Sequence, residues 1–428
     1  MRILSGKKAT EQVRKMAVRG SRYAEAEWVA RKIIADVRRR GDRAVRKYAE
    51  RWDGLKKGEP LRVAEEEIET AWKSAGAELR GALRTAAANI RRFCEMQKPR
   101  DWRRTRGGIT LGQIVRPLNS AGCYVPSGRY PLVSTLLMTV IPAQVAGVKE
   151  IRIVSPKPQA EVLAAAAMLG VSEVYRVGGA QAVAALAYGT ESIPRVDKIV
   201  GPGNVYVTAA KKEIAFDCSI DLVAGPTEGL IVSDTGTPEF IAADLVAQAE
   251  HDPEAMAVFI TTRRDLASAV ARAVNELSKD NALARESMRR NGVILISASR
   301  SQSFAWANAI AAEHLTVDGD DLAMVRDAGS VFVGDYSPQA AGDYASGPNH
   351  VLPTGGAARF RGGLSVVDFV KVISVQKLSR AGLRRIGPAV ELLATKEGLR
   401  GHAESIRVRC GQGGREPSNK RRTRAAHA

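Results

Sequence analysis

Cysteine is scarce in this sequence of 428 residues, and its four copies lie far apart. Cys94, Cys123, Cys218 and Cys410 form no Cys-x-x-Cys pair. Neither a disulfide framework nor a thiolate metal site is therefore expected. We interpret all four as buried side chains that pack as small apolar groups.

Long apolar runs are also missing. The longest apolar stretch, residues 130–148, is interrupted by serine, threonine, proline and glutamine, which argues against a membrane span. The first residues, Met-Arg-Ile-Leu-Ser-Gly-Lys-Lys, lack the apolar core of a signal peptide. We therefore expect a cytoplasmic protein that does not bind membranes.

Acidic residues are too few to balance the basic ones, and the formal net charge is +18. The excess lies in residues 1–110 and 413–428, whereas residues 111–412 carry equal numbers of acidic and basic side chains. Solvated arginine faces of helices, or ion-pair networks in a heat-adapted protein, explain this distribution better than nucleic-acid binding. We expect no nucleic-acid partner.

The chain exceeds the length at which one hydrophobic core stops growing, so more than one domain is expected. Residues 1–100 have helical periodicity. Ser21 is a candidate cap for a helix in which Val29, Ile33 and Val37 recur at helical spacing, and Gly41 ends it. A second helix is predicted to follow directly.

From about residue 150, short runs rich in valine and isoleucine alternate with alanine-rich helical segments. The predicted order is strand 150–155, helix 159–169, strand 173–177, helix 180–188 and strand 198–200. A second series predicts strands near 229–234, 256–262, 292–297 and 330–334, with helices near 238–250, 264–278 and 303–312. Such alternation indicates parallel sheets. The sequence thus predicts an α/β protein with two Rossmann-like parallel-sheet domains, a helical N-terminal region and a small helical C-terminal appendage.

Two glycine-rich loops follow predicted strands, at residues 178–181 and 201–204. Ligands of open parallel sheets bind beyond the carboxyl ends of the strands, so these loops are candidate binding elements. Neither loop completes the Gly-x-Gly-x-x-Gly fingerprint. A dinucleotide site and a tight structural turn therefore both stay open.

Histidine occurs only five times. Gln248 and His251 stand three residues apart near the end of a predicted helix, so both side chains project from one face. That spacing suits a metal, and a helix-end histidine bonded to a carbonyl is the alternative. His427 lies in the basic tail without such a context.

Asp343 lies in a loop dense in glycine, proline and small polar residues, after a predicted strand. Its carboxylate could meet an imidazole pair, or it could form a local Asx turn. Together, Gln248, His251, Asp343 and His402 would supply two nitrogen and two oxygen ligands. Zinc accepts such a mixed set, and manganese or iron also could.

Glu313 and His314 are expected to close the helix that ends at Ala312. Neighbouring side chains on a helix point about 100° apart, yet at a helix end both can face one cavity from different sides. Two separate proton-transfer roles follow. The alternative is a solvent-facing acid beside a helix-end histidine.

A set of ordered motifs resembles the histidinol dehydrogenase family, from about residue 20 to residue 410. The motifs are Gly-Gly-Ala-Gln-Ala-Val-Ala-Ala-Leu-Ala-Tyr-Gly-Thr-Glu-Ser (178–192), Lys-Ile-Val-Gly-Pro-Gly-Asn (198–204), Ala-Gly-Pro-Thr-Glu (224–228), Ala-Gln-Ala-Glu-His-Asp (247–252), Glu-His-Leu (313–315) and Gly-Asp-Tyr-Ala-Ser-Gly-Pro-Asn-His-Val-Leu-Pro-Thr-Gly-Gly (342–356). Each motif is weak alone, whereas the set is specific. The resemblance implies an aldehyde-dehydrogenase-like fold and oxidation of L-histidinol to L-histidine through the aldehyde, with two NAD and one water.

The resemblance also implies roles for single residues. One zinc ion per subunit would be held by Gln248, His251, Asp343 and His402. The acid–base pair would be Glu313 and His314. The substrate would contact Thr227, Gln248, His251, His314, Asp343, Glu397 and His402, with His350 as a weaker candidate. NAD would be held by Tyr124, Gln181 and Asn204.

The family organisation further implies an intertwined homodimer in which Glu397 and His402 complete the partner subunit's site. The expected segments are an arm (1–19), a first α/β domain with the metal and catalytic residues (20–123 and 227–365), a second α/β domain for NAD (124–226), a C-terminal helical segment (366–412) and a disordered basic tail (413–428).

Three departures from the family pattern stand out: Thr227 in place of a common serine, Gly229 in place of a usual branched residue, and the extra basic tail. Two alternatives remain beside histidinol oxidation. A related zinc and NAD enzyme could oxidise another small polar alcohol. A metal-dependent hydrolase could use the same ligands with Glu313 as base, but it would have no use for the glycine-rich loops.

Overall fold

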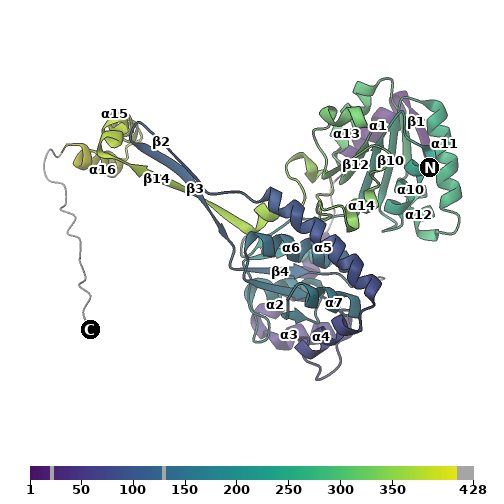
Figure 1. The fold of residues 1–428 in the computed structure, drawn as a ribbon, viewed down its shortest axis with the longest axis horizontal. Helices are drawn as coiled ribbons and strands as arrows, with labels where there is room; N and C mark the ends of the chain where they lie inside the picture. Colours follow the sequence, from purple (N-terminus) through teal and green to yellow (C-terminus); the bar gives the residue numbers. More distant parts are fainter. Residues whose placement is uncertain (20–23, 128–131, 412–428) are drawn as a thin grey trace. The chain divides into compact units, whose positions relative to one another are not determined.

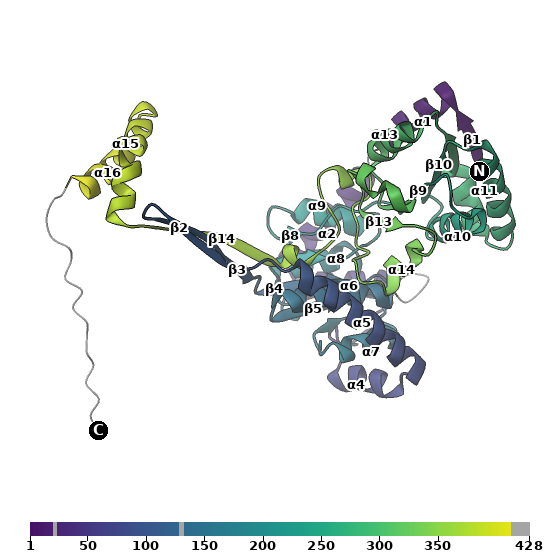
Figure 2. The ribbon, with the colours of Figure 1, turned by 45° about the horizontal axis from the view of Figure 1, so that its top comes forward.

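The computed structural model describes residues 1–19, 24–127 and 132–411. The cap expected at Ser21, the tail 413–428 and His427 lie outside the described residues. The chain divides into two units, residues 1–98 with 117–370 and residues 99–116 with 371–428. Figure 1 and Figure 2 show the ribbon of both units in two views.

The first sheet of the larger unit has five parallel strands in the order β6-β5-β4-β7-β8. The strands are β4 (Ser120–Tyr124), β5 (Glu150–Val154), β6 (Val174–Tyr175), β7 (Lys198–Val200) and β8 (Ser219–Ile220). The connecting helices are α6 (Val133–Ala146), α7 (Ala160–Met168), α8 (Gly179–Tyr188) and α9 (Val205–Ile214). The small, apolar residues of these helices are largely buried against the sheet, as expected when helices cover both faces. The strand and helix alternation predicted after residue 150 is confirmed.

The N-terminal helices pack on this first sheet. They are α2 (Ala24–Arg40), α3 (Asp42–Tyr48), the π-helical turn η1 (Ala49–Asp53), α4 (Glu65–Ser74) and α5 (Ala77–Gln97). The apolar face of α2, with Ile33 and Val37, shares a core with Val183 of α8. The predicted grouping of residues 20–123 with residues 227–365 is therefore wrong, because the apolar faces of these helices are buried on the sheet that follows them in sequence.

The second sheet of the larger unit has six parallel strands in the order β1-β11-β10-β9-β12-β13. They are β1 (Arg2–Ser5), β9 (Glu228–Val232), β10 (Met256–Thr261), β11 (Val293–Ile296), β12 (His314–Val317) and β13 (Ser330–Val333). The associated helices are α1 (Gly6–Ala17), α10 (Pro238–Ala249), α11 (Arg264–Leu277), α12 (Ala282–Asn291), α13 (Arg300–Ile310), η2 (Gly319–Met324), α14 (Gln339–Tyr344), η3 (Ala357–Arg359) and η4 (Val366–Phe369). Residues 1–19 are no separate arm, since β1 pairs with β11 and Val13 of α1 is buried in the core.

The smaller unit combines a three-stranded sheet, in the order β14-β3-β2, with two helices. Its elements are β2 (Trp102–Arg106), β3 (Ile109–Pro117), β14 (Val370–Leu378), α15 (Arg380–Lys396) and α16 (Arg400–Cys410). The prediction of a purely helical segment over 366–412 is wrong for β14. Its partner β3 lies more than 250 residues earlier in the chain, so the pairing is not a local property of the sequence.

No helix among residues 1–19, 24–127 and 132–411 is long and apolar enough to cross a bilayer. Cys94, Cys123 and Cys218 are buried as expected, whereas Cys410 on α16 is partly exposed. Burial raises the pKa of each of the three buried thiols. They therefore stay protonated and unreactive at neutral pH.

A buried ion pair holds one of the glycine-rich loops. Lys211 of α9 and Asp221, which follows β8, have side chains that are 2% and 0% exposed. The Lys211 ammonium also donates to the Gly201 carbonyl at 3.0 Å. Asp221 accepts from the Gly201 N–H at 2.7 Å. Both charges thus fix the start of the loop 201–204.

We expect Asp221→Ala to lower the thermal midpoint of unfolding by several degrees. The substitution leaves the Lys211 charge buried without its carboxylate, which costs about 3–5 kcal/mol. Glu27→Ala is the matched control, because it removes a carboxylate from the exposed pair with Lys212 of the same helix. Thermal melts of the three proteins check the expectation, and equal midpoints for the two variants would contradict it.

Candidate active site

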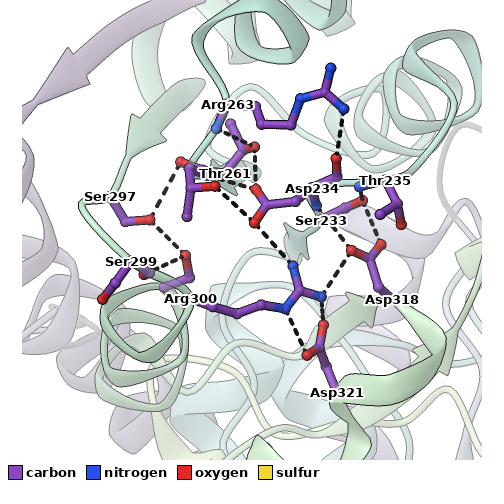
Figure 3. Close-up of polar contacts among 12 residues, drawn as sticks. Ser233, Asp234, Thr235, Thr261, Arg263, Ser297, Ser299, Arg300, Asp318 and Asp321 are labelled. Atoms are coloured by element: carbon purple, nitrogen blue, oxygen red, sulfur yellow. Dashed lines mark hydrogen bonds and ion pairs between the residues drawn. The ribbon is translucent and has the colours of Figure 1, made fainter.

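The carboxyl edge of the second sheet, where ligands of open parallel sheets usually bind, is closed by the protein's own side chains. Figure 3 shows the Arg300 guanidinium between three carboxylates. Arg300 donates to Asp321 at 2.8 Å, Asp318 at 2.9 Å and Asp234 at 3.1 Å. The cavity beside this network measures only about 20 Å³. The expected catalytic residues lie at the opposite, amino edge.

Glu313 and His314 stand at the start of a strand. Helix α13 ends at Ile310, and Ala311 takes a left-handed conformation with φ of 51°. His314 then opens β12, where it pairs with Gly229 of β9. The expectation of a helix end is wrong, because the turn at Ala311 redirects the chain before Glu313.

Glu313 is a buried carboxylate with two neighbouring donors. Its Oε2 accepts from the backbone N–H of Glu228 at 3.0 Å and lies 2.8 Å from the Thr227 hydroxyl. Burial raises the pKa of Glu313 to about 7, although the His314 ring and both donors oppose the rise. A carboxyl group with this pKa can accept and release a proton near neutral pH.

His314 links Glu313 to Asp343. Its Nε2 lies 3.1 Å from Asp343 Oδ1, and its ring stacks on Phe332 with centroids 5.9 Å apart. Its Nδ1 lies 3.6 Å from Glu313 Oε2 and is buried with no hydrogen-bond partner among the described residues. Burial by itself lowers the pKa of His314, but the carboxylates of Glu313 and Asp343 outweigh this effect, so the pKa is raised. With Nε2 directed at a carboxylate, Nδ1 is the nitrogen left to accept a proton.

Asp343 lies on the short helix α14 rather than in an open loop. Burial raises the pKa of Asp343, but the hydrogen bond and the charge of His314 outweigh it, so that the pKa lies below its usual value. The backbone carbonyl of Asp343 contacts Nδ1 of His350 at 2.7 Å. Burial lowers the pKa of His350, which therefore stays neutral near pH 7.

Gln248 and His251 lie at the end of α10. The Gln248 Oε1 lies 3.1 Å from the Thr227 hydroxyl, and its side chain is buried against Gly229. A Cβ at Gly229 would come within 2.9 Å of the Gln248 Cγ, so the glycine gives Gln248 room. His251 is exposed, and its Nδ1 lies 3.3 Å from the Gln248 carbonyl. This contact orients the ring and leaves Nε2 outward, as in many metal-binding histidines.

The predicted metal ligands are divided between the two units. Within the described residues, no group of three or more His, Cys, Asp or Glu side chains is placed to hold a metal ion. The larger unit contributes the Gln248 amide, His251 and Asp343, and His251 is near enough to Asp343 to act on it electrostatically. This partial set of one nitrogen and two oxygens fits zinc once a fourth ligand is added.

Glu397 and His402 belong to the smaller unit. Glu397 ends α15, Gly398 turns the chain with φ of 77°, and His402 lies in the first turn of α16. Both side chains are exposed within this unit.

The three residues expected to contact NAD line a single cavity of about 530 Å³. Tyr124 ends β4, Gln181 lies in the first turn of α8, and Asn204 caps α9 by accepting from two backbone N–H groups. All three follow strands of the first sheet, at its carboxyl edge. The cavity also includes Pro126, which lines a larger cavity of about 1220 Å³ that reaches His251.

Asp53 is a buried residue of this cavity that the sequence analysis did not identify. Its Oδ2 accepts from the Gly178 N–H at 2.9 Å and from Gln181 Nε2 at 3.0 Å. The Gly179 N–H donates to the Tyr124 hydroxyl at 3.0 Å. Two backbone N–H groups of the loop 178–181 therefore donate to side chains of the protein itself. No local sequence signal points to Asp53.

Asp244 was also missed. It lies on α10 one turn before Gln248, so the helical spacing could have indicated it. Burial raises the pKa of Asp244 to about 6, and the neighbouring charge of Asp343 adds to the rise. A second carboxylate therefore lies near the His314 and Asp343 pair.

Comparison with known proteins identifies the family. Residues 17–410 match the profile of the family described as histidinol dehydrogenase. The chain belongs to the histidinol dehydrogenase family. Membership makes this protein an oxidoreductase, as expected from its motifs.

Several histidinol dehydrogenases are similar over nearly their whole length. The enzyme of Methanothermobacter thermautotrophicus is 50% identical over 392 residues, which cover 88% of this chain and 92% of that protein. The enzyme of Methanosarcina mazei is 43% identical over 417 residues, with 94% and 95% covered. The crystal structure of histidinol dehydrogenase from Elizabethkingia anophelis aligns with a TM-score of 0.91 and 34% identity, covering 96% of this chain and 98% of that one.

We expect Glu313→Gln to change how the stability of the metal-free protein depends on pH. The raised pKa of Glu313 means that its contribution to stability is present below about pH 4.5 and is lost as the pH rises through about 7. Glutamine does not titrate. Between pH 4.5 and pH 7, the free energy of unfolding of the variant should therefore rise by about 3 kcal/mol relative to that of the parent.

Thermal melts of both proteins in the presence of chelator, from pH 4.5 to pH 8, test this expectation. Glu254→Gln, at an exposed carboxylate, is the control and should follow the parent at each pH. A constant difference between parent and Glu313→Gln would show that Glu313 titrates normally.

Proposed function

We propose that this protein catalyses the zinc-dependent oxidation of L-histidinol to L-histidine through L-histidinal, with two NAD as hydride acceptors, the last step of histidine biosynthesis. The observation that carries the proposal is the buried chain of contacts from Glu313 through His314 to Asp343 in a member of the histidinol dehydrogenase family. This arrangement places two groups with pKa values above their ordinary ones side by side.

Gln248, His251 and Asp343, with His402 from the smaller unit of a partner subunit, would hold zinc, which would bind the amine and imidazole nitrogens of the substrate and fix its orientation. Thr227, Glu397 and, more weakly, His350 would add contacts to the substrate. Thr227 keeps the hydroxyl of the serine common in the family, and that hydroxyl lies between Gln248 and Glu313.

In the first oxidation, His314 would take the proton of the alcohol hydroxyl while hydride leaves the carbon for NAD. Its Nδ1 is the acceptor that the structure leaves without a partner among the described residues. Asp343 at Nε2 holds the ring and stabilises the charge that it gains. The product is the aldehyde.

In the second oxidation, Glu313 would take a proton from water, whose oxygen adds to the aldehyde carbon. The resulting hydrate anion would give its hydride to a second NAD, and the carboxylic acid so formed would release a proton to become the carboxylate. A carboxylate with a pKa of about 7 is a strong enough base for this step and is still ionised in part at neutral pH.

Tyr124, Gln181 and Asn204 would bind NAD in the cavity of about 530 Å³. The cavity and the larger one that reaches His251 share Pro126 in their walls. The two cavities therefore adjoin within the larger unit, which supports the proposal, because hydride transfer requires the cofactor and the substrate to lie side by side.

We expect two NADH for each L-histidinol consumed, measured by absorbance against product. Removal of metal by a chelator should lower the rate at least about tenfold, with recovery on addition of zinc. Failure to form NADH at saturating L-histidinol would contradict the proposal. Other small polar alcohols, offered in parallel, test the related dehydrogenase.

Two variants separate the roles in the same assay. His314→Ala should slow both oxidations by about a hundredfold, because it removes the base for the alcohol proton and the partner of Glu313. Glu313→Gln should slow oxidation of L-histidinal by a similar factor and that of the alcohol much less. Equal slowing of both steps by Glu313→Gln would remove its assignment as the base for water.

We further propose that the active enzyme is a homodimer in which Glu397 and His402 complete the partner's site. In support, both residues are exposed within the smaller unit, and the larger unit by itself holds only part of the ligand set. The family resemblance implies that the two subunits share their sites in this way.

Mixed dimers test the shared site. After exchange of subunits between inactive His402→Ala and His314→Ala proteins, about a quarter of the parental activity should return, because half of the dimers regain one intact site. A mixture of His402→Ala and Glu397→Ala is the control and should stay inactive, since both changes lie in the same segment. Absence of recovery after exchange verified by differently tagged subunits would count against sharing.

A further inference from the structure

Arg19 lies just beyond α1, and its guanidinium binds Glu228, a neighbour of Glu313. It donates to both carboxylate oxygens of Glu228, at 2.7 and 2.5 Å. The same guanidinium donates to the backbone carbonyls of Met16 at 2.6 Å and Ile310 at 2.8 Å. Arg19 therefore connects the end of α1 with the start of β9 and with the turn that leads to Glu313.

Glu228 is the immediate neighbour of Glu313. Its backbone N–H donates to Glu313 Oε2 at 3.0 Å, and its own carboxylate is almost fully buried. Among the described residues, that carboxylate also accepts from the Gly355 N–H, at 2.9 Å. A buried carboxylate with one amide donor would be costly, so the paired charge of Arg19 offsets that cost and holds the Glu228 side chain in place.

The charges around Glu313 are few. His314 faces it from β12, Glu228 faces it from β9, and the Thr227 hydroxyl lies beside them. Of these, Glu228 carries a charge of the same sign and raises the pKa of Glu313. Arg19 neutralises that charge through a two-pronged contact, the geometry in which an arginine–carboxylate pair is strongest.

We propose that Arg19 is a positioning residue for Glu313, which it holds in place and shields from a neighbouring like charge by binding Glu228. The inference rests on the proposed role of Glu313 as the base of the second oxidation. Arg19 acts through Glu228 and touches neither substrate nor cofactor.

A second arginine supplies a matched control. Arg359 donates to the carbonyl of Ala17 at 2.8 Å and to that of Ala309, so it joins the same two segments as Arg19. Within the described part of the chain, its side chain donates to backbone carbonyls and to no carboxylate. Loss of Arg359 thus loosens the same junction without uncovering a buried charge.

The test is the pH dependence of kcat for oxidation of L-histidinal by the zinc-loaded enzyme. For Arg19→Met, the rise of kcat with pH should move up by about one pH unit, because Glu228 then acts on Glu313 without its counter-charge. The rate should fall about fivefold at pH 7 and recover by pH 9. Arg19→Lys should lie between parent and Arg19→Met, and Arg359→Met should keep the parental profile.

A further variant guards against a fold defect. Arg19→Met combined with Glu228→Gln should return the profile toward that of the parent, since the amide carries no charge. A loss of rate that is equal at every pH, or no rescue by the second change, would overturn the proposal. If Arg19→Met does not fold, the same decision rests on Arg19→Lys with and without Glu228→Gln.

The pH profile of Glu313→Gln distinguishes a failure of this inference from a failure of the proposed function. If Glu313→Gln keeps the parental pH profile, the role of Glu313 fails and the inference falls with it. If Glu313→Gln abolishes the rise and Arg19→Met leaves it in place, Glu313 keeps its role and Arg19 loses its own.

Discussion

The burial of the Glu313 carboxylate is the constraint on which the rest of the site depends. Taking a carboxylate out of water is costly unless hydrogen bonds replace its solvation. The Glu228 N–H and the Thr227 hydroxyl supply part of that replacement, and the His314 ring, 3.6 Å away, acts on the carboxylate through its charge rather than through a hydrogen bond. Because β9 and β12 are neighbours in the sheet, these donors are held by backbone pairing rather than by flexible side chains.

The two sheets of the larger unit use opposite edges. The first sheet opens its carboxyl edge, where Tyr124, Gln181 and Asn204 surround a cavity, as is usual for nucleotide sites. The second sheet closes that edge with the Arg300 network and gathers its reactive groups at the amino edge. The ion network and the Glu313–His314 pair are thus separated by the length of the strands.

Sequence patterns predicted most of the parallel strands and their helices, since buried strands read as continuous apolar runs whatever their partner. The strand β2, with five exposed residues, and β1, with three of its four residues exposed, lack that signal. The strand β1 forms because the distant strand β11 pairs with it, whereas β2 forms a hairpin with β3, the next strand in the sequence. Spacing along α10 likewise placed Gln248 near His251, because both belong to one helix end.

Contacts made across the fold could not be read in this way. The turn at Ala311 is a left-handed conformation of a non-glycine residue, which sequence rules do not predict, and it decides where Glu313 points. Arg19 meets Glu228 across 209 positions. Asp53 meets Gly178 across 125. Such pairs depend on how the sheets are assembled rather than on any local pattern.

The carboxylate of Asp53 has a consequence for the chemistry of the cavity that Tyr124, Gln181 and Asn204 line. It takes the Gly178 N–H at the start of α8, the kind of position at which Rossmann enzymes hold a pyrophosphate. Asp53 already accepts from this N–H, so the amide is not available to a phosphate. At this turn the Gly178 N–H therefore binds a carboxylate of the protein itself. A genome search for the glycine fingerprint of dinucleotide enzymes would miss this cavity.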